Sequence, residues 1–256
     1  MNKFYTIIMI IFFTTNMLTA KTGTYNREKL ELVKIIKQQQ ILSQRIAKAY
    51  LYVKKNKSTE RATQQLKESL DSFYKTYSTI NSKTKSSQIR KIMSSIKKSS
   101  SDFKRLSKKS ATDENVKEIL TLSDTVLNKS KRVEQLLKKS LKKEAYLWTS
   151  KSGQQQVLIE RIARYYIALQ SNSKDKTIEK KLKSTIAEFS RNHERLMKNK
   201  SNTQSIKDKL NEVDRLWKRT NKLYSDKKIS TIIFQATDKI SKNMKKVGKL
   251  YSAVYK

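Results

Sequence analysis

Apolar residues recur along this chain at alternating intervals of three and four positions, which is the pattern of a helix that buries one face. The pattern is clearest from about Asn26 to Lys55. Its members there are Leu32, Ile35, Leu42, Ile46, Ala49 and Val53. The same kind of spacing recurs seven more times between polar stretches. We therefore predict eight amphipathic helices.

Helix starts and the scarcity of turn residues support the same fold class. Ser58, the pair Thr112–Asp113 and Asp175 each precede an apolar-periodic segment, and their side-chain oxygens can cap a helix N-terminus. The chain has no proline and three glycines, whereas sheet proteins use both residue types in their many tight turns. We predict an all-α protein.

An internal repeat divides the chain. Residues 38–53 (QQQILSQRIAKAYLYV) and 154–169 (QQQVLIERIARYYIAL) align without a gap at an offset of 116 residues. Each unit then holds four helices. The connecting segment SLKKEAYLWTSK at 140–151 contains no glycine or proline, which favours one long shared helix. The sequence thus predicts two tandem up-down four-helix bundles, residues 21–142 and 143–256, stacked end to end.

The N-terminus has the layout of a secretory signal. Lys3 is followed by the apolar run FYTIIMIIFF at 4–13 and by TTNMLTA, which ends in the small residue Ala20. The run is shorter than the roughly 20 residues that a membrane span needs. We expect residues 1–20 to be a signal peptide, a mature chain beginning near Lys21, and a periplasmic or secreted protein. Leu18 stands where a small residue is preferred, so an uncleaved membrane anchor is the alternative.

The charge of the chain admits two interpretations. Lys and Arg number 58 against 22 Asp and Glu, which gives a formal net charge of +36. Such an excess attracts polyanions, whereas the lysines can equally form a solvated surface. Nucleic acid binding in the cytoplasm would require that the N-terminal segment is not an export signal, so nucleic acid is not the expected partner.

Residues for metal or catalytic chemistry are scarce. The chain has no cysteine and a single histidine, His193, which we predict to be a surface helix residue. The inward-facing Glu-x-x-His pair of di-iron bundles and a glycine-rich phosphate loop are both missing from the sequence. We expect a non-enzymatic protein with no cofactor and no metal site.

The repeated glutamines are the unusual feature of both units. Gln39 and Gln155 occupy seam positions, where an unpaired buried amide costs roughly 1–3 kcal/mol. These amides and the arginines that follow either form a polar pocket for a small polar or anionic ligand, or form a hydrogen-bonded layer that sets helix register. The candidate ligand-binding residues are Gln38, Gln39, Gln40 and Arg45 in the first unit and Gln154, Gln155, Gln156 and Arg161 in the second.

The same segments carry a family resemblance. ILSQRIAKAYL at 41–51 and SGQQQVLIERIARYY at 152–166 resemble the signature of the periplasmic domain of PilJ-type transducers, the methyl-accepting chemotaxis transducers of type IV pili. NarX-type nitrate and nitrite sensors share a related segment. The resemblance implies tandem copies of a four-helix-bundle sensor that binds a small ligand near its first helix.

The resemblance also implies where the ligand lies and which partners the chain has. In the nitrate sensors an arginine from each subunit of a dimer holds the ligand, and the matching positions here are Gln40 and Gln156. Glutamine donates a hydrogen bond but brings no charge, so the resemblance does not extend to nitrate specificity. The sequence carries no kinase or methyl-accepting segment. The implied partners are therefore a membrane receptor or pilus-related protein, or a second copy in a homodimer.

Two functions follow from these observations. The first is an exported sensor-type module that binds a small polar or anionic ligand. The alternative is a basic envelope protein that binds polyanions, such as anionic lipid, cell-wall polymer or nucleic acid, through lysine-rich helix faces. Binding that collapses as salt rises would identify the alternative.

Overall fold

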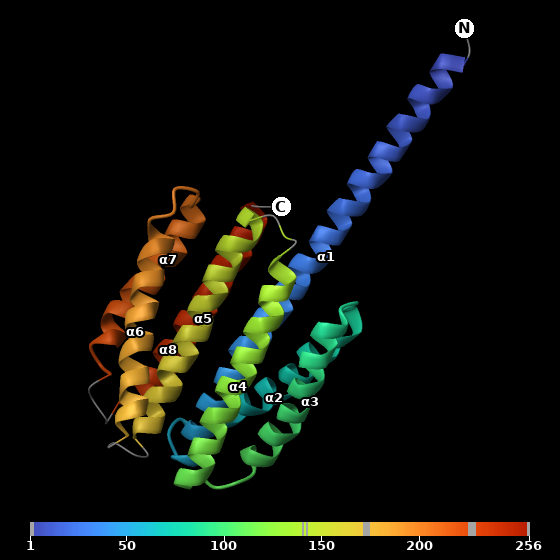
Figure 1. Cartoon of the computed structure of the whole chain (residues 1–256). Coiled ribbons are helices and arrows are strands. Elements are labelled where there is room, and N and C mark those ends of the chain that lie inside the picture. The colour runs from blue at the N-terminus through green and yellow to red at the C-terminus, as the bar shows by residue number, and fades with distance from the viewer. Residues whose placement is uncertain (1–2, 140, 142, 171–174, 225–228, 255–256) are drawn as a thin grey trace.

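The computed structural model describes residues 3–139, 141, 143–170, 175–224 and 229–254, with side chains from Glu28 onward except at 143–145. These residues form eight helices and no strands, so the predicted all-α helical fold is confirmed (Figure 1). The helices are α1 (Lys3–Lys54), α2 (Thr59–Lys83), α3 (Ser87–Ser107), α4 (Asp113–Lys138), α5 (Lys143–Leu169), α6 (Lys176–Met197), α7 (Gln204–Asn221) and α8 (Ser230–Val254).

Side-chain caps fix several helix starts. Thr112 accepts a hydrogen bond from the backbone N–H of Asn115, and Asp175 accepts from two backbone N–H groups in the first turn of α6, as the sequence predicts. Ser58 differs from the prediction. Its backbone is left-handed, with φ of 51°, and its hydroxyl makes no cap hydrogen bond, because a capping side chain requires extended backbone at that position.

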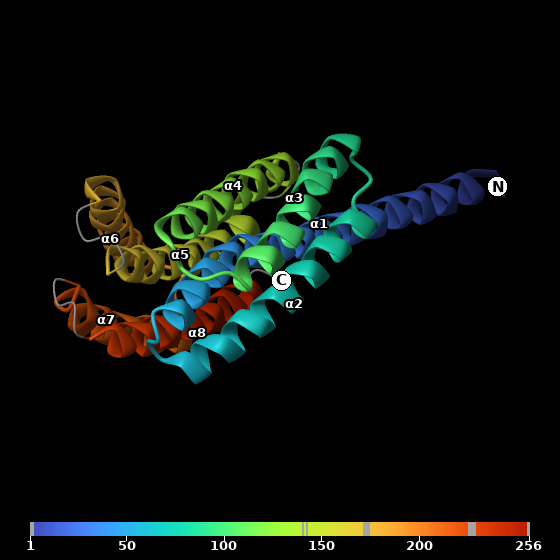
Figure 2. The same cartoon turned by 90° about the horizontal axis from the view of Figure 1, so that it is seen from below.

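Each unit is a ring of four neighbouring helices, α1 to α4 and α5 to α8 (Figures 1 and 2). The buried positions of the second unit repeat those of the first. Those of α2 recur in α6 at an offset of 116 residues, and those of α4 recur in α8 at an offset of 114. Examples are Phe73 with Phe189, Ile119 with Ile233, Val126 with Ile240 and Val133 with Val247.

The two units lie side by side, which corrects the predicted end-to-end stacking. α4 ends at Lys138 and α5 begins at Lys143, so no shared helix joins the units, and α5 packs along α1 instead. The two helices are parallel and in register, because Ile41 meets its repeat counterpart Val157 in one cluster. The reason is hydrophobic: α1 is buried on nearly every face from residue 39 to residue 52, and end-to-end stacking would leave one of those faces in water.

The core is continuous across both units. Buried apolar side chains from all eight helices join in one cluster. Tyr52 of α1 packs on Phe234 of α8, with ring centroids 4.7 Å apart. The domain boundaries predicted at 21–142 and 143–256 stay predictions, but neither unit has a core closed off from the other.

The N-terminal part of α1 extends beyond the bundle (Figure 1). The side chains of residues 1–27 lie outside those that the structure describes, so the signal peptide at 1–20 and the mature start near Lys21 stay predictions. Within the described residues, no helix combines the length and the hydrophobicity needed to cross a membrane.

Candidate functional site

A chain of buried charges crosses the boundary between the units. Lys48 of α1 forms ion pairs with Glu160 of α5 and with Asp238 of α8, each at 2.7 Å, and all three side chains are almost fully buried. Arg45, one turn earlier on α1, contacts the other oxygen of Glu160 at 2.6 Å and donates to Ser241 at 3.1 Å. We call Arg45, Lys48, Glu160 and Asp238 the inter-unit cluster.

Neighbouring groups favour the charged forms of Asp238 and Arg45 within the inter-unit cluster. Burial alone would raise the pKa of Asp238, but Lys48, a hydrogen bond from Gln65 and Arg45 together hold that pKa below its ordinary value. The pKa of Arg45 is raised because Glu160 and Asp238 outweigh its desolvation. Asp238 therefore stays ionised, and the ion pairs of the cluster tie α1 to α5 and α8.

A symmetry-related contact lies on the opposite side of the α1–α5 pair. Arg164, the repeat counterpart of Lys48, contacts Asp124 of α4 at 2.9 Å and also donates to Ser123. Asp124 is the counterpart of Asp238 at the α4-to-α8 offset. Each unit thus sends a buried cation from its first helix to an aspartate in the last helix of the other unit.

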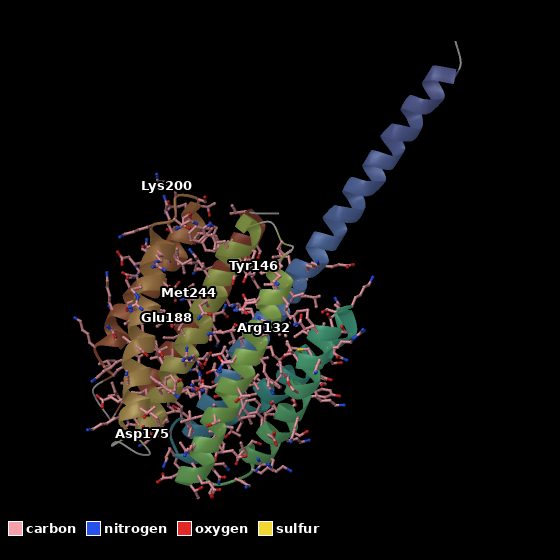
Figure 3. The ribbon with its side chains drawn as sticks, viewed as in Figure 1. Arg132, Tyr146, Asp175, Glu188, Lys200 and Met244 are labelled. Atoms are coloured by element: carbon pink, nitrogen blue, oxygen red, sulfur yellow. The ribbon has the colours of Figure 1, made fainter. Side chains whose placement is uncertain are left out.

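A second polar cluster surrounds Glu134 of α4. Its carboxylate accepts hydrogen bonds from Lys37 and Gln40 at 2.7 Å, from Tyr146 at 2.7 Å and from Ser150 at 2.8 Å. Tyr146 lies close to the start of α5 (Figure 3). Burial would raise the pKa of Glu134, but the Lys37 charge and the hydrogen bonds from Lys37, Gln40 and Tyr146 hold it below its ordinary value. Glu134 is therefore an ionised carboxylate with a complete set of donors.

The counterpart of the Glu134 cluster in the second unit has lost both charges. Gly153 stands at the repeat position of Lys37, and Gly248 stands at the α8 position that matches Glu134. A cavity of about 410 Å³ opens there between α1, α5 and α8. We call it the glycine pocket. Its walls are Val33, Lys34, Lys37, Gln38, Ile41, Thr149, Ser150, Ser152, Gly153, Gln156, Lys245, Gly248, Lys249, Ser252 and Ala253.

The glycines also set how closely the helices approach. A Cβ at Gly153 would lie 2.5 Å from Cγ of Lys37, and a Cβ at Gly248 would lie 2.7 Å from the Ser152 hydroxyl. Glycine in a helix interior costs roughly 1 kcal/mol relative to alanine. Gly153 lets α5 approach α1 closely, and Gly248 lets α8 approach α5 closely.

The glycine pocket is positively charged. Four lysines lie in its wall, and no carboxylate does among the described residues that form it. Lys37 is already paired with Glu134, and Lys34 with the exposed Glu31, whereas Lys245 and Lys249 reach the pocket from α8. Such a cavity can bind a small anion by charge-assisted hydrogen bonds.

An adjoining cavity of about 450 Å³ shares three wall residues with the glycine pocket, namely Gln38, Gln156 and Lys245. It carries both signs of charge, with Arg61 and Lys242 facing Glu68 and Asp238. The inter-unit cluster forms part of its wall through Arg45 and Asp238. Gln38 of the first repeat and Gln156 of the second therefore lie between two polar cavities.

The predicted site residues are divided among several places. Gln38 and Gln156 face the shared pocket wall, whereas Gln40 belongs to the Glu134 cluster and Arg45 to the inter-unit cluster. Gln39 is turned toward α2, where it accepts from Thr76. The prediction was one complete set of site residues in each unit. Instead, one glutamine from each unit, Gln38 and Gln156, lines a common cavity.

The remaining candidates of the second unit lie elsewhere. Gln154 and Gln155 face α6, donating to Glu188 at 3.4 Å and to the backbone oxygen of Phe189 at 3.1 Å. Arg161 donates to Tyr165 at 3.3 Å. The contacts of Gln154 and Gln155 fit the interpretation of a hydrogen-bonded layer between helices, whereas that of Arg161 lies within α5.

His193 is buried, so its predicted surface position is wrong. Its exposed fraction is 3 %, and its ring stacks on Phe189 with centroids 6.0 Å apart. Burial, only partly offset by Asp214, lowers its pKa to about 4. The histidine occupies a core position of α6, because the position after Phe189 on the buried face falls at residue 193.

Sequence reasoning missed Lys48, Glu160 and Asp238, and also the lysines of α8. A signal for Lys48 and Glu160 was present, because charged residues at 48, 160 and 164 interrupt otherwise apolar helical segments. For the pocket, the signal was the presence of Gly153 and Gly248 within amphipathic helical segments.

Comparisons with known proteins give no relative for this chain: no family model, curated protein or solved structure matches it. Within the described residues, no group of three or more His, Cys, Asp or Glu side chains is placed to hold a metal ion.

Proposed function

We propose that this chain is an exported sensor-type module that binds a small polar or anionic ligand in the glycine pocket. The observation that carries the proposal is the composition of that pocket. Four lysines, two repeated glutamines and several hydroxyls surround a cavity whose described walls hold no carboxylate. Export rests on the secretory-signal layout of residues 1–20, with Lys3, the apolar run at 4–13 and the small residue Ala20.

The position of the pocket suits a sensor. Its walls come from α1 of the first unit and from α5 and α8 of the second, so a ligand contacts both units at once. A ligand shifts a conformational equilibrium only as far as its affinity differs between the states. If the two units change their packing, the walls of a site between them move, and the affinity for the ligand then differs between the two states. A membrane receptor or pilus-related partner would detect that change in packing.

The test is calorimetry and thermal denaturation of the mature protein with sodium salts of small anions at constant ionic strength. Gln156→Leu should abolish the ligand response, because it removes a donor from the shared wall. Gln154→Leu is the matched control, since Gln154 faces α6 and should leave the response intact. Equal responses in both variants would place the ligand elsewhere and refute the proposal.

The α8 lysines offer a second matched pair. Lys249 lines the pocket, whereas Lys246 is exposed on the same helix outside the pocket wall. Lys249→Gln should weaken anion binding severalfold, and Lys246→Gln should not. If the two changes weaken binding equally, the effect comes from the general positive charge of the protein.

The alternative function, polyanion binding, is favoured by the outer face of α3. Lys91, Lys97, Lys98 and Lys104 are all exposed there, and Figure 3 shows nitrogen-tipped side chains pointing outward from the bundle. Such binding falls steeply with salt. Titration with anionic vesicles and with a cell-wall polymer between about 50 and 200 mM salt distinguishes it from pocket binding, which should change little.

A further inference from the structure

We infer that the ligand of the glycine pocket is a small organic carboxylate, which occupies the position that the Glu134 side chain fills in the first unit. This inference rests on the proposed function and narrows its ligand class. It comes from comparing matching positions in the two units. In the first unit the Glu134 side chain fills the position, which we call the filled version, and in the second unit Gly248 leaves it empty, which we call the emptied version.

The filled version shows which chemistry the locus accepts. Glu134 takes two hydrogen bonds on each oxygen: Lys37 and Gln40 donate to one, and Tyr146 and Ser150 donate to the other. The carboxylate is buried and kept ionised by these donors. A planar group with two oxygens, each accepting two hydrogen bonds, matches these four donors.

The emptied version lacks both the carboxylate and the lysine, because Gly153 stands at the position of Lys37, but it keeps the amide donor. Gln156 is the counterpart of Gln40 in the repeat, and Lys245 matches Lys131 at the α4-to-α8 offset. Both line the glycine pocket, as does Lys34, while Gly248 replaces the acidic side chain. Lys34 of the first unit, together with Lys245 and the Gln156 amide of the second, therefore surrounds a space from which the second unit's own carboxylate is missing.

The remaining wall residues indicate that the carboxylate belongs to an organic molecule with an apolar part. Val33, Ile41 and Ala253 give the pocket an apolar side, and Thr149, Ser152 and Ser252 give it hydroxyls. An inorganic anion would leave the apolar side uncovered, whereas a few methylene or methyl groups would cover it, at roughly 0.8 kcal/mol for each buried CH₂. A cavity of about 410 Å³ accommodates such a molecule.

The first experiment compares ligand classes by calorimetry at fixed ionic strength. The probes are sodium acetate, butyrate and succinate on one side and sodium nitrate, sulfate and phosphate on the other. We expect at least one carboxylate to bind tenfold or more tightly than every inorganic anion. Inorganic anions that bind equally well would overturn the carboxylate inference and leave the proposed function standing. Failure of every probe to bind would sink both.

The second experiment restores the missing side chain. Ser152→Ala removes the hydroxyl that a side chain at 248 would meet, and Gly248→Glu then supplies an internal carboxylate. The matched variant is Ser152→Ala with Gly248→Gln, which fills the same volume without charge, and Ser152→Ala alone is the reference.

Carboxylate binding should disappear in the Glu variant, and its melting temperature should rise above that of the Gln variant by several degrees. If the two melting temperatures are equal, the pocket does not prefer a carboxylate and the inference is overturned. Should the Glu variant bind acetate or butyrate as tightly as the reference, the ligand does not occupy this locus. Circular dichroism verifies that each variant remains helical, and Gln156→Leu provides an independent block if a Gly248 variant does not fold.

Discussion

Replacing Asp238 with Asn should destabilise the whole chain, because Asp238 is a buried counter-ion at the boundary between the units. Its exposed fraction is 4 %, and Lys48, which it contacts at 2.7 Å, is fully buried. Asn has the same shape and can still accept a hydrogen bond from Gln65, so the substitution removes charge with little change in packing.

The size of the effect follows from the charges that remain. Without Asp238, the single carboxylate Glu160 is left to balance both Lys48 and Arg45. Removing one partner of a buried ion pair costs about 3–5 kcal/mol, because the other charge stays buried without compensation. Since Glu160 still contacts Lys48, we expect the lower part of that range, about 3 kcal/mol. Against a typical total of about 5–15 kcal/mol this is a large fraction.

The assay is urea denaturation followed by circular dichroism. Asp208→Asn is the control, because Asp208 is exposed on α7 and its hydrogen bond from Gln204 survives the change. Its free energy of unfolding should stay within about 0.5 kcal/mol of the unmodified protein. The double variant Lys48→Met with Asp238→Asn removes both charges, and it should be more stable than the sum of the two single effects predicts.

Two results would refute the reasoning. A loss below about 1 kcal/mol for Asp238→Asn would mean that water reaches the cluster and screens it. Strict additivity in the double-mutant cycle would mean that Lys48 and Asp238 do not stabilise each other at all.

Two further predictions concern single side chains. The lowered pKa of His193 means that the folded state favours the neutral ring, so stability present above pH 6.5 should be lost as the pH falls toward 4, by roughly 3 kcal/mol. His193→Phe should remove that part of the pH dependence in denaturation curves, and an unchanged slope would contradict the assignment. Gln39→Leu should be neutral or stabilising in melting curves and should leave any ligand response intact, because Gln39 faces α2 rather than the pocket and its amide nitrogen has no hydrogen-bond partner among the described residues. A lost ligand response would show that Gln39 shapes the site.

The helices were predictable because local signals determine them. Spacing of apolar residues and caps such as Thr112 and Asp175 depend on near neighbours in the chain. The side-by-side packing depends on a second apolar face of α1, which a single heptad seam does not describe. Ala47, Tyr50 and Leu51 lie off that seam and are fully buried. Counting apolar positions on every face of residues 41–53 would have indicated a central helix.

The site was only partly predictable for a similar reason. The repeat identified Gln38 and Gln156, which the structure brings to one shared wall, but it could not tell which glutamine of each triplet turns toward which neighbour. That choice depends on where α2, α4, α6 and α8 pack around the two central helices. Gly248 lies outside the aligned segments, and its pairing with Glu134 emerges only when α4 and α8 are compared by their buried positions.

Joining both units in one chain has a consequence for stoichiometry. In a dimer of identical subunits, any pocket next to the symmetry axis occurs twice, and occupancy of one copy can alter the other. Here Glu134 closes one copy from within while Gly153 and Gly248 open the other. Saturation should therefore follow a simple hyperbola with one molecule per chain. Under the proposed function, the response would then be proportional to occupancy, without the sigmoidal threshold that two interacting sites can produce.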